Sequence, residues 1–240
     1  MSACRLGVLA FGDSITNGGG ELQWGVALQS WALWVARGLA LPYSGYAGDG
    51  ARVADVLAEQ LPAVPTAARY DVGCLYIGVN DVRALDWDRA RFEAGHRTAL
   101  AFLAERCDRL LTATVPLDLG RPRAADKVHD ANAAIRASAA AHDALVVGLD
   151  RFKARNLVMT DHVHPTAFGQ IAIAERALDV LAADGMAVRR RPSTLIRYET
   201  TRTGRLRGDL TYAYRHLKVS TRAAWDLRRA ARSGTARSGT

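Results

Sequence analysis

Short apolar runs alternate with longer segments of helical periodicity over most of the chain. Strands are predicted for the apolar runs at residues 6–11, 71–79, 110–115 and 144–149, with a further short extended segment at 42–47. Helical periodicity predicts helices at residues 22–39, 51–61, 88–106, 125–142 and 166–183. Because strands that alternate with helices of this length form a sheet covered on both faces, the pattern predicts a three-layer α/β/α domain. We expect a central parallel sheet of about five strands.

Charge divides the chain near Asp184 and Gly185. Residues 1–186 carry 18 Lys and Arg against 21 Asp and Glu, whereas residues 187–240 carry 14 against 3. The chain is therefore expected to consist of a mildly acidic domain over 1–186 and a basic C-terminal extension over 187–240. The extension is predicted to be partly helical, with a disordered end that repeats the sequence Ala-Arg-Ser-Gly-Thr.

Within the extension, residues 209–229 are basic and roughly amphipathic. One apolar stripe contains Leu210, Tyr214, Leu217, Thr221 and Ala224. Two interpretations remain open: a helix docked on the domain, which we prefer, or weak association with an anionic surface, either a membrane or nucleic acid.

Composition indicates a globular protein with reduced thiols. The chain has 240 residues, 49% of them hydrophobic, and neither a signal-peptide pattern nor an apolar run of about 18 residues. Its three cysteines are odd in number and far apart, so neither a disulfide framework nor a metal site is expected. We therefore expect a cytoplasmic protein.

A serine lies directly after the first predicted strand, in the sequence Gly12-Asp13-Ser14-Ile15-Thr16. Functional groups of parallel sheets gather at this end of the strands. The following segment is expected to begin a helix whose positive end would stabilise an oxyanion. No lysine is present as a P-loop requires, the later glycines lack dinucleotide-binding spacing, and Thr16 breaks the Gly-x-Ser-x-Gly elbow. A nucleophilic serine and a simple turn serine remain the alternatives.

A second polar motif, Thr160–Pro165, contains Asp161 and His164 three residues apart, just before the last predicted helix. A serine nucleophile needs a histidine base, and that histidine needs a carboxylate to hold its tautomer. This short loop can supply both. Taken alone, the motif also fits a capping aspartate beside a surface histidine.

Together these blocks resemble the SGNH hydrolase superfamily of GDSL-type esterases and lipases. The resemblance covers about residues 4–183 and includes the Gly-Asp-Ser-Ile block, Gly78–Asp81 and the Asp-x-x-His-Pro block, in the family's order. Isoleucine replaces the usual leucine of the first block. Residues 45–50 resemble the remaining block, in which Gly48 matches the oxyanion glycine and Gly45 is the alternative.

The resemblance implies a flavodoxin-like fold and a serine esterase. Ser14 would be the nucleophile, His164 the general base and acid, and Asp161 its orienting carboxylate. The oxyanion hole would contain the N–H groups of Ser14 and Gly48 and the side-chain amide of Asn80. Asn80 is alternatively a turn residue, since Asn-Asp pairs are common in turns.

No cofactor, metal or obligatory protein partner is implied. The expected partner is a small-molecule ester: a lipid, an acylated sugar or a small acyl ester, hydrolysed through an acyl-enzyme. The alternative is an acyltransferase that uses the same triad and an alcohol acceptor. Four tryptophans are candidates for lining an acyl or sugar pocket, although core packing is expected for at least Trp31: Trp24, Trp31, Trp34 and Trp87. A protein that only binds anionic surfaces would leave the catalytic blocks unexplained.

Overall fold

The computed structural model describes residues 5–119, 124–154, 156–198 and 201–235. By its internal contacts the chain separates into two compact units, Met1–Tyr198 and Glu199–Thr240. The first unit carries all five predicted site residues, so its architecture decides where they lie.

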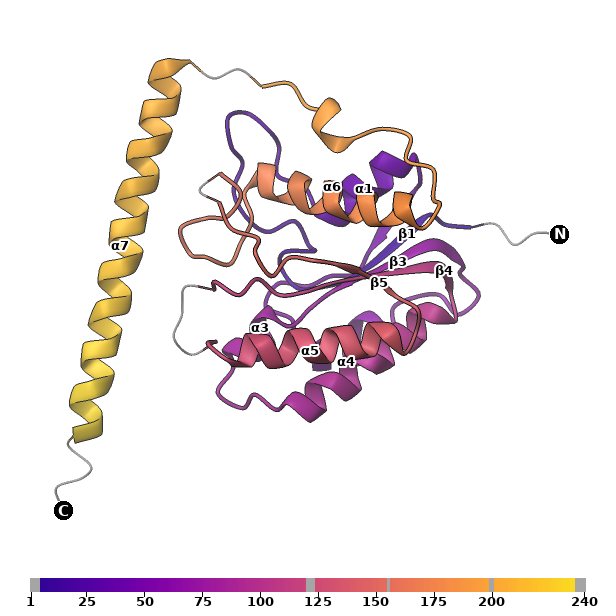
Figure 1. The fold of residues 1–240 in the computed structure, drawn as a ribbon, viewed down its shortest axis with the longest axis horizontal. Helices are drawn as coiled ribbons and strands as arrows, with labels where there is room; N and C mark the ends of the chain where they lie inside the picture. The colour runs from indigo at the N-terminus through magenta and orange to yellow at the C-terminus, as the bar shows by residue number, and fades with distance from the viewer. Residues whose placement is uncertain (1–4, 120–123, 155, 199–200, 236–240) are drawn as a thin grey trace. The chain divides into compact units, whose positions relative to one another are not determined.

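One parallel sheet forms the centre of the first unit (Figure 1). Its strand order is β2-β1-β3-β4-β5, and every neighbouring pair is parallel. The predicted five-stranded sheet is thereby confirmed. The strands are β1 (Val8–Gly12), β2 (Tyr43–Gly45), β3 (Tyr70–Tyr76), β4 (Cys107–Ala113) and β5 (Leu145–Val147).

Helices cover both faces of the sheet, which confirms the three-layer arrangement. In Figure 1, α1 and α6 lie on one face, and α3, α4 and α5 lie on the other. The bounds are α1 (Trp31–Leu39), α3 (Val79–Arg83), α4 (Arg89–Ala104), α5 (Lys127–Ala140) and α6 (Ala167–Ala183). A shorter helix, α2 (Val53–Asp55), continues as a π-helix over Val56–Gln60 and together they occupy the predicted helix at 51–61.

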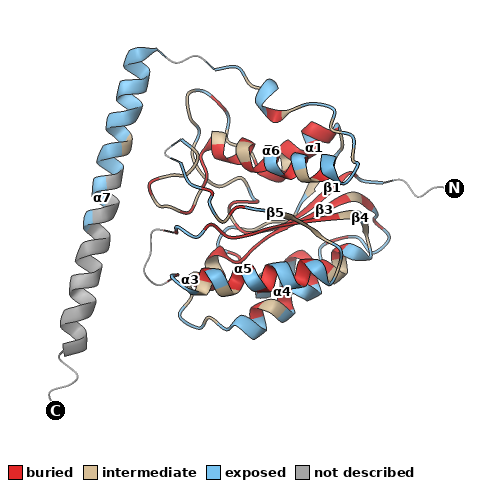
Figure 2. Cartoon of the chain, in the orientation of Figure 1, coloured by how far each residue is buried: buried red, intermediate tan, exposed pale blue. Residues whose placement is uncertain are grey.

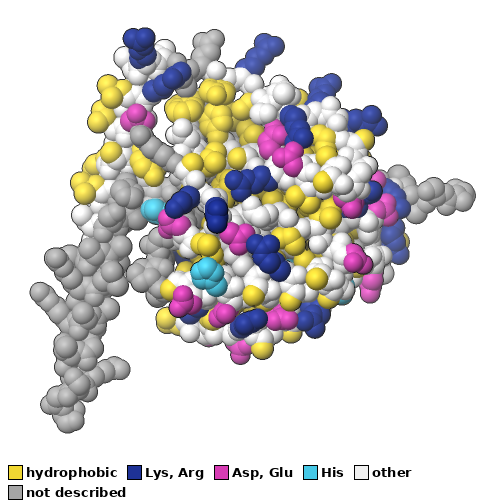
Figure 3. All heavy atoms as spheres, viewed as in Figure 1, with side chains coloured by type: hydrophobic (Ala, Val, Ile, Leu, Met, Phe, Trp, Pro, Cys, Tyr) yellow, Lys and Arg dark blue, Asp and Glu magenta, His cyan; other side chains and the backbone are white. Residues whose placement is uncertain are grey.

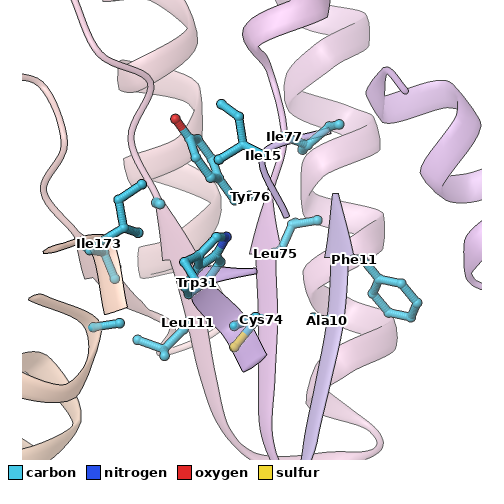
Figure 4. Packing of buried hydrophobic residues seen from close by; sticks show 14 of the residues in the cluster. Ala10, Phe11, Ile15, Trp31, Cys74, Leu75, Tyr76, Ile77, Leu111 and Ile173 are labelled. Atoms are coloured by element: carbon cyan, nitrogen blue, oxygen red, sulfur yellow. The ribbon is translucent and has the colours of Figure 1, made fainter. Parts of the chain in front are cut away.

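Burial on both faces explains why the strands read as apolar runs. All five residues of β1 are buried, and most residues of β3 and β4 are buried as well (Figure 2). Trp31 packs edge to face on Tyr76, the last residue of β3, with ring centroids 6.4 Å apart, and Figure 4 shows both in the core with Ile15 and Ile173. The expected core position of Trp31 is confirmed, and Trp34 is also buried.

The helix predicted at 22–39 begins only at Trp31, so the first part of that prediction was wrong. Trp24 and Gly25 have φ values of 48° and 78°, and this left-handed backbone cannot belong to a right-handed helix. Ser30 then caps α1, because its hydroxyl accepts a hydrogen bond from the Ala32 N–H at 3.2 Å. Residues 21–30 are consequently a loop rather than a helix.

The first compact unit extends beyond the predicted division at residues 186 and 187. The N–H groups of Arg189 and Arg190 donate to the Gly38 carbonyl at 2.9 and 3.0 Å. Farther along, Tyr198 stacks on Trp24 with ring centroids 6.1 Å apart. These contacts attach residues 187–198 to the first unit, so within the basic extension it is the part from Glu199 onward that forms the second unit.

The described part of the second unit is a single long helix, α7 (Arg202–Thr235), of 34 residues. It is longer at both ends than the amphipathic segment predicted at 209–229. The first copy of the repeat predicted to be disordered, residues 231–235, is the last part of α7, so that prediction was wrong there; the second copy, 236–240, lies outside the described residues. Among the described helices, none has the length and apolar character needed to cross a membrane.

Candidate active site

A tight turn at the end of β1 presents Ser14. The Asn17 N–H donates to the Asp13 carbonyl at 2.9 Å, and the Gly19 N–H donates to the Ser14 carbonyl at 2.6 Å. Gly18 and Gly20 adopt φ values of 91° and 140°, which glycine tolerates and which end any helical path. No helix follows Ser14 in the described chain before α1, so the expected helix at this point was wrong and a helix dipole cannot be invoked.

A second loop holds Asp161 and His164 in a fixed geometry. The Asp161 Oδ1 atom accepts hydrogen bonds from the N–H groups of Val163 at 2.9 Å and His164 at 3.0 Å. The Met159 N–H donates to the His164 carbonyl at 2.8 Å, which closes the base of the loop. His162 adopts a φ of 59° between the two residues, so the chain reverses and both side chains point the same way.

The two loops bring the three predicted residues into one hydrogen-bonded chain. The Ser14 Oγ atom lies 2.9 Å from His164 Nε2, and His164 Nδ1 lies 2.7 Å from Asp161 Oδ2. Ser14 and His164 are 150 residues apart in the sequence. This order of hydroxyl, imidazole and carboxylate has the geometry of a nucleophile, its base and the group that orients the base.

The electrostatics of the Ser14–His164–Asp161 hydrogen-bond network favour a positive charge on His164. The hydrogen bond to Asp161 raises the pKa of His164, although partial burial acts in the opposite direction. Burial alone would raise the pKa of Asp161, but the hydrogen bonds from His164 and from two backbone N–H groups outweigh it and lower that pKa. Asp161 therefore stays ionised when His164 takes up a proton.

Two buried carboxyl groups support the loops around Ser14. Asp13 Oδ1 accepts from the Ile15 N–H at 2.9 Å, and Asp81 accepts from the Val53 N–H at 3.1 Å. Burial raises the pKa of Asp13 to about 7 and that of Asp81 to about 6. Asp81 thereby joins the start of α3 to the start of α2, and Asp13 holds the turn that carries Ser14.

The predicted oxyanion-hole groups differ in whether an N–H donor is left for a substrate. The Asn80 side chain lies in the first turn of α3 and donates one N–H to the Ala51 carbonyl at 3.0 Å. An amide carries two N–H donors, so this bond orients the side chain and leaves the second N–H for a substrate oxygen. By contrast, the N–H of Gly48 donates to the Gly12 carbonyl at 3.1 Å. The alternative residue, Gly45, lies within β2.

Two buried glutamines tie the Ser14 turn to the rest of the domain, and sequence reasoning missed both. Gln60 pairs with both backbone polar groups of Gly12, at 3.0 Å to its N–H and 2.8 Å to its carbonyl. Gln170 donates to the carbonyls of Ile15 at 2.9 Å and Gly19 at 3.1 Å, and it accepts from the Trp31 N–H at 2.8 Å. For each of them, the available signal was a glutamine within a helical pattern of apolar residues.

Two open hollows adjoin the turn. One, with a volume of about 500 Å³, is lined by Gly48, Gln60 and the carboxylates of Asp49, Asp55 and Glu59, among others. The second, of about 280 Å³, is lined by polar groups of Asn17, Ser30 and Tyr43 and by apolar side chains that include Leu28 and Leu33. A hydrogen bond of 3.0 Å between Asn17 and Asp49 joins the rims of the two hollows.

The sequence of the chain matches the family of GDSL-like lipases and acylhydrolases over residues 10–171. That range includes Ser14, Asn80, Asp161 and His164, and more than half of the chain. The chain belongs to the GDSL-like lipase/acylhydrolase family. This GDSL-like protein is a carboxylic ester hydrolase by family.

Solved structures show the same fold. Axe2, an acetylxylan esterase from Geobacillus stearothermophilus, superimposes with a TM-score of 0.58 at 20% identity, covering 74% of this chain and 96% of Axe2. LAE5, an alpha/beta hydrolase enzyme from the metagenome of Lake Arreo in Spain, gives a TM-score of 0.59 at 22% identity, covering 73% of this chain and 94% of LAE5. No curated protein matches the GDSL-like chain. The structural similarity establishes the SGNH-type fold.

Proposed function

We propose that the protein is a serine esterase that hydrolyses a small carboxylic ester through an acyl-enzyme intermediate. The observation that carries the proposal is the continuous chain of hydrogen bonds from Ser14 through His164 to Asp161. Family membership supports the reaction class, and the site's position at the carboxyl ends of β1 and β3 agrees with it.

In the first half of the reaction, Ser14 Oγ attacks the carbonyl carbon of the ester while His164 Nε2 takes the hydroxyl proton. The tetrahedral intermediate collapses, and the bond to the alcohol oxygen breaks. His164 gives its proton to that oxygen, so a neutral alcohol leaves and the acyl group stays on Ser14. Asp161 remains ionised and stabilises the imidazolium throughout.

In the second half, water replaces the alcohol. His164 removes a proton from the water, whose oxygen attacks the acyl carbon, and the same proton then returns to Ser14 Oγ as the carboxylic acid is released. Both tetrahedral intermediates carry a negative oxygen. We assign its stabilisation chiefly to the Ser14 N–H and the second N–H of Asn80. Gly48 contributes only after substrate displaces its bond to Gly12.

Polar groups present in both hollows favour a substrate with a hydrophilic alcohol part, such as an acylated sugar. Asn17, Ser30 and Tyr43 in one hollow, and the carboxylates in the other, offer hydrogen-bonding groups suited to hydroxyls. The acetylxylan esterase activity of Axe2 is consistent with this choice. Among the candidate esters, we therefore place acylated sugars before lipids.

Turnover of a short-chain p-nitrophenyl ester and of acetylated sugars tests the proposal. We expect Ser14→Ala to remain folded and to lose activity by about 10³-fold or more, because the triad acts as a unit. Ser193→Ala, at an exposed serine, serves as the matched control and should keep full activity. Retained turnover in pure Ser14→Ala protein would exclude the mechanism. An added alcohol acceptor that yields a new ester faster than acid would instead favour acyl transfer.

A further inference from the structure

Helix α7 presents an apolar stripe that its own unit leaves uncovered. Leu206, Leu210, Tyr214 and Leu217 are spaced by four, four and three residues, which places them within about a quarter of the helix circumference. Each of the four is between 61% and 66% exposed. Amphipathic helices gain most of their stability by burying their apolar face, so we expect another surface to cover this stripe.

Charge identifies the nature of that surface. Helix α7 contains nine Lys and Arg residues and two Asp residues, a net charge of +7 with its histidine neutral. By helical spacing, Arg207 and Lys218 border the stripe on one side and Arg202 borders it on the other. Apolar and basic side chains lie next to each other on the described part of α7 in Figure 3. A partner for this helix must therefore offer both an apolar layer that accepts the stripe and negative charge beside it.

A second copy of the helix does not meet this requirement. Pairing two identical stripes would bring two helices of charge +7 together, and repulsion between like charges would oppose the contact. Nucleic acid supplies the negative charge, but its phosphate backbone offers no apolar layer for three leucines. An anionic lipid surface supplies both, because its headgroups attract basic side chains and its acyl boundary accepts the apolar face.

In place of the docked helix preferred from the sequence, we propose that α7 is an in-plane membrane anchor. The helix lies parallel to an anionic lipid surface, with Leu206, Leu210, Tyr214 and Leu217 inserted at the acyl boundary. Long basic side chains at the edges of the stripe extend back to the headgroups. This proposal concerns where the protein resides and involves no catalytic step, so it does not depend on the esterase assignment.

Co-sedimentation of the full chain with lipid vesicles tests the anchor. We expect binding to phosphatidylcholine vesicles that contain phosphatidylglycerol and little binding to phosphatidylcholine alone. Binding should weaken several-fold as salt rises from about 0.1 M to about 0.5 M, because screening shortens the range of the attraction. The Leu210→Gln variant should bind about tenfold less well or worse, since it removes one large apolar group from the inserted face.

Two tyrosines provide a matched pair of variants. Tyr214 lies on the stripe, whereas Tyr212 lies on the opposite side of the helix, two residues away. We expect Tyr214→Gln to reduce vesicle binding clearly and Tyr212→Gln to leave it nearly unchanged. Circular dichroism of each full-length variant verifies that the catalytic unit remains folded.

Three results would overturn the proposal. The first is equal loss of vesicle binding in both tyrosine variants, since the stripe would then have no special role. The second is tight binding to duplex DNA that Leu210→Gln does not alter, with no vesicle binding. The third is absence of vesicle binding together with a Leu210→Gln variant that either melts at a lower temperature or converts a dimer to a monomer. That result would mean that protein covers the stripe.

Discussion

Replacing Gln170 by methionine tests whether a buried amide holds the nucleophile turn in place. The two side chains are similar in size, but methionine neither donates nor accepts the strong hydrogen bonds of an amide. The substitution would remove three hydrogen bonds of 2.8 to 3.1 Å, to Ile15, Gly19 and Trp31.

The expected loss of stability follows from the burial of those three partners. Gly19 is only half-buried, so water can replace the lost donor at its carbonyl. The Ile15 carbonyl would keep the hydrogen bond from the Gly18 N–H at 3.3 Å, whereas the buried Trp31 N–H would remain unpaired. One such unpaired group costs about 1–3 kcal/mol, so we expect a loss of that size in the free energy of unfolding. For a typical domain that is a large fraction of the total.

Urea denaturation, followed by circular dichroism, measures this loss. Gln29→Met is a suitable control, because Gln29 Oε1 is buried without a hydrogen-bond partner in the described structure and no bond to it would be broken. In the fraction that stays folded, kcat for a p-nitrophenyl ester should fall by about tenfold or more, because Ser14 shifts from its position beside His164. A Gln170→Met protein no less stable than Gln29→Met would refute the supporting role of Gln170.

Three further predictions concern the reaction. Asn80→Ala should lower kcat by about 10²–10³ with a smaller change in KM, because an oxyanion donor acts mainly in the transition state; a change in KM alone would make Asn80 a binding or turn residue. Esterase activity should rise with pH through the pKa of His164, which lies above its ordinary value because of Asp161. In Asp161→Asn this rise should move to lower pH, and kcat should fall by about 10⁴. A pH profile that does not move in the variant would contradict the assigned pair of His164 and Asp161. Removing the chain from Glu199 onward should leave kcat on a small soluble ester within about threefold, since every proposed catalytic group precedes it; a larger loss, measured on folded protein, would place part of the site in the second unit.

The regular parts of the fold were predictable because their signals are local. A parallel strand buried on both faces, such as β1, appears as an unbroken apolar run. The candidate triad was likewise predictable, because the required residue types occur at the ends of predicted strands and in a familiar order. The structure then brings Ser14 and His164 within 2.9 Å of each other.

The errors arose where distant contacts decide the local structure. Apolar residues at 24, 28, 31 and 35 have the spacing of one helix, but the left-handed backbone at Trp24 and Gly25 makes the first part of this segment a loop. Residues 187–198 looked like part of a basic tail, yet ion pairs of Arg191 with Glu175 and Asp179 on α6 attach them to the domain. The ion pairs of Arg191 leave no signal in the neighbouring sequence.

The same limit applies to the supporting groups of the site. Gln60 and Gln170 gain their importance only from the backbone groups of Gly12 and Ile15, which lie far away in the sequence. The direction of the Gly48 N–H, toward the Gly12 carbonyl, also depends on how the loop after β2 packs against β1. Residue types alone cannot establish either geometry.

Covalent labelling with a fluorophosphonate tests the central claim most directly, because this reagent reacts with serines activated by a neighbouring base. Intact mass spectrometry should show one phosphonyl group per chain, and peptide mapping should place it on Ser14, with esterase activity falling in proportion to the labelled fraction. Ser14→Ala protein should remain unlabelled. Full activity in a chain labelled at Ser14, or loss of activity with the label on another residue, would contradict the proposed nucleophile.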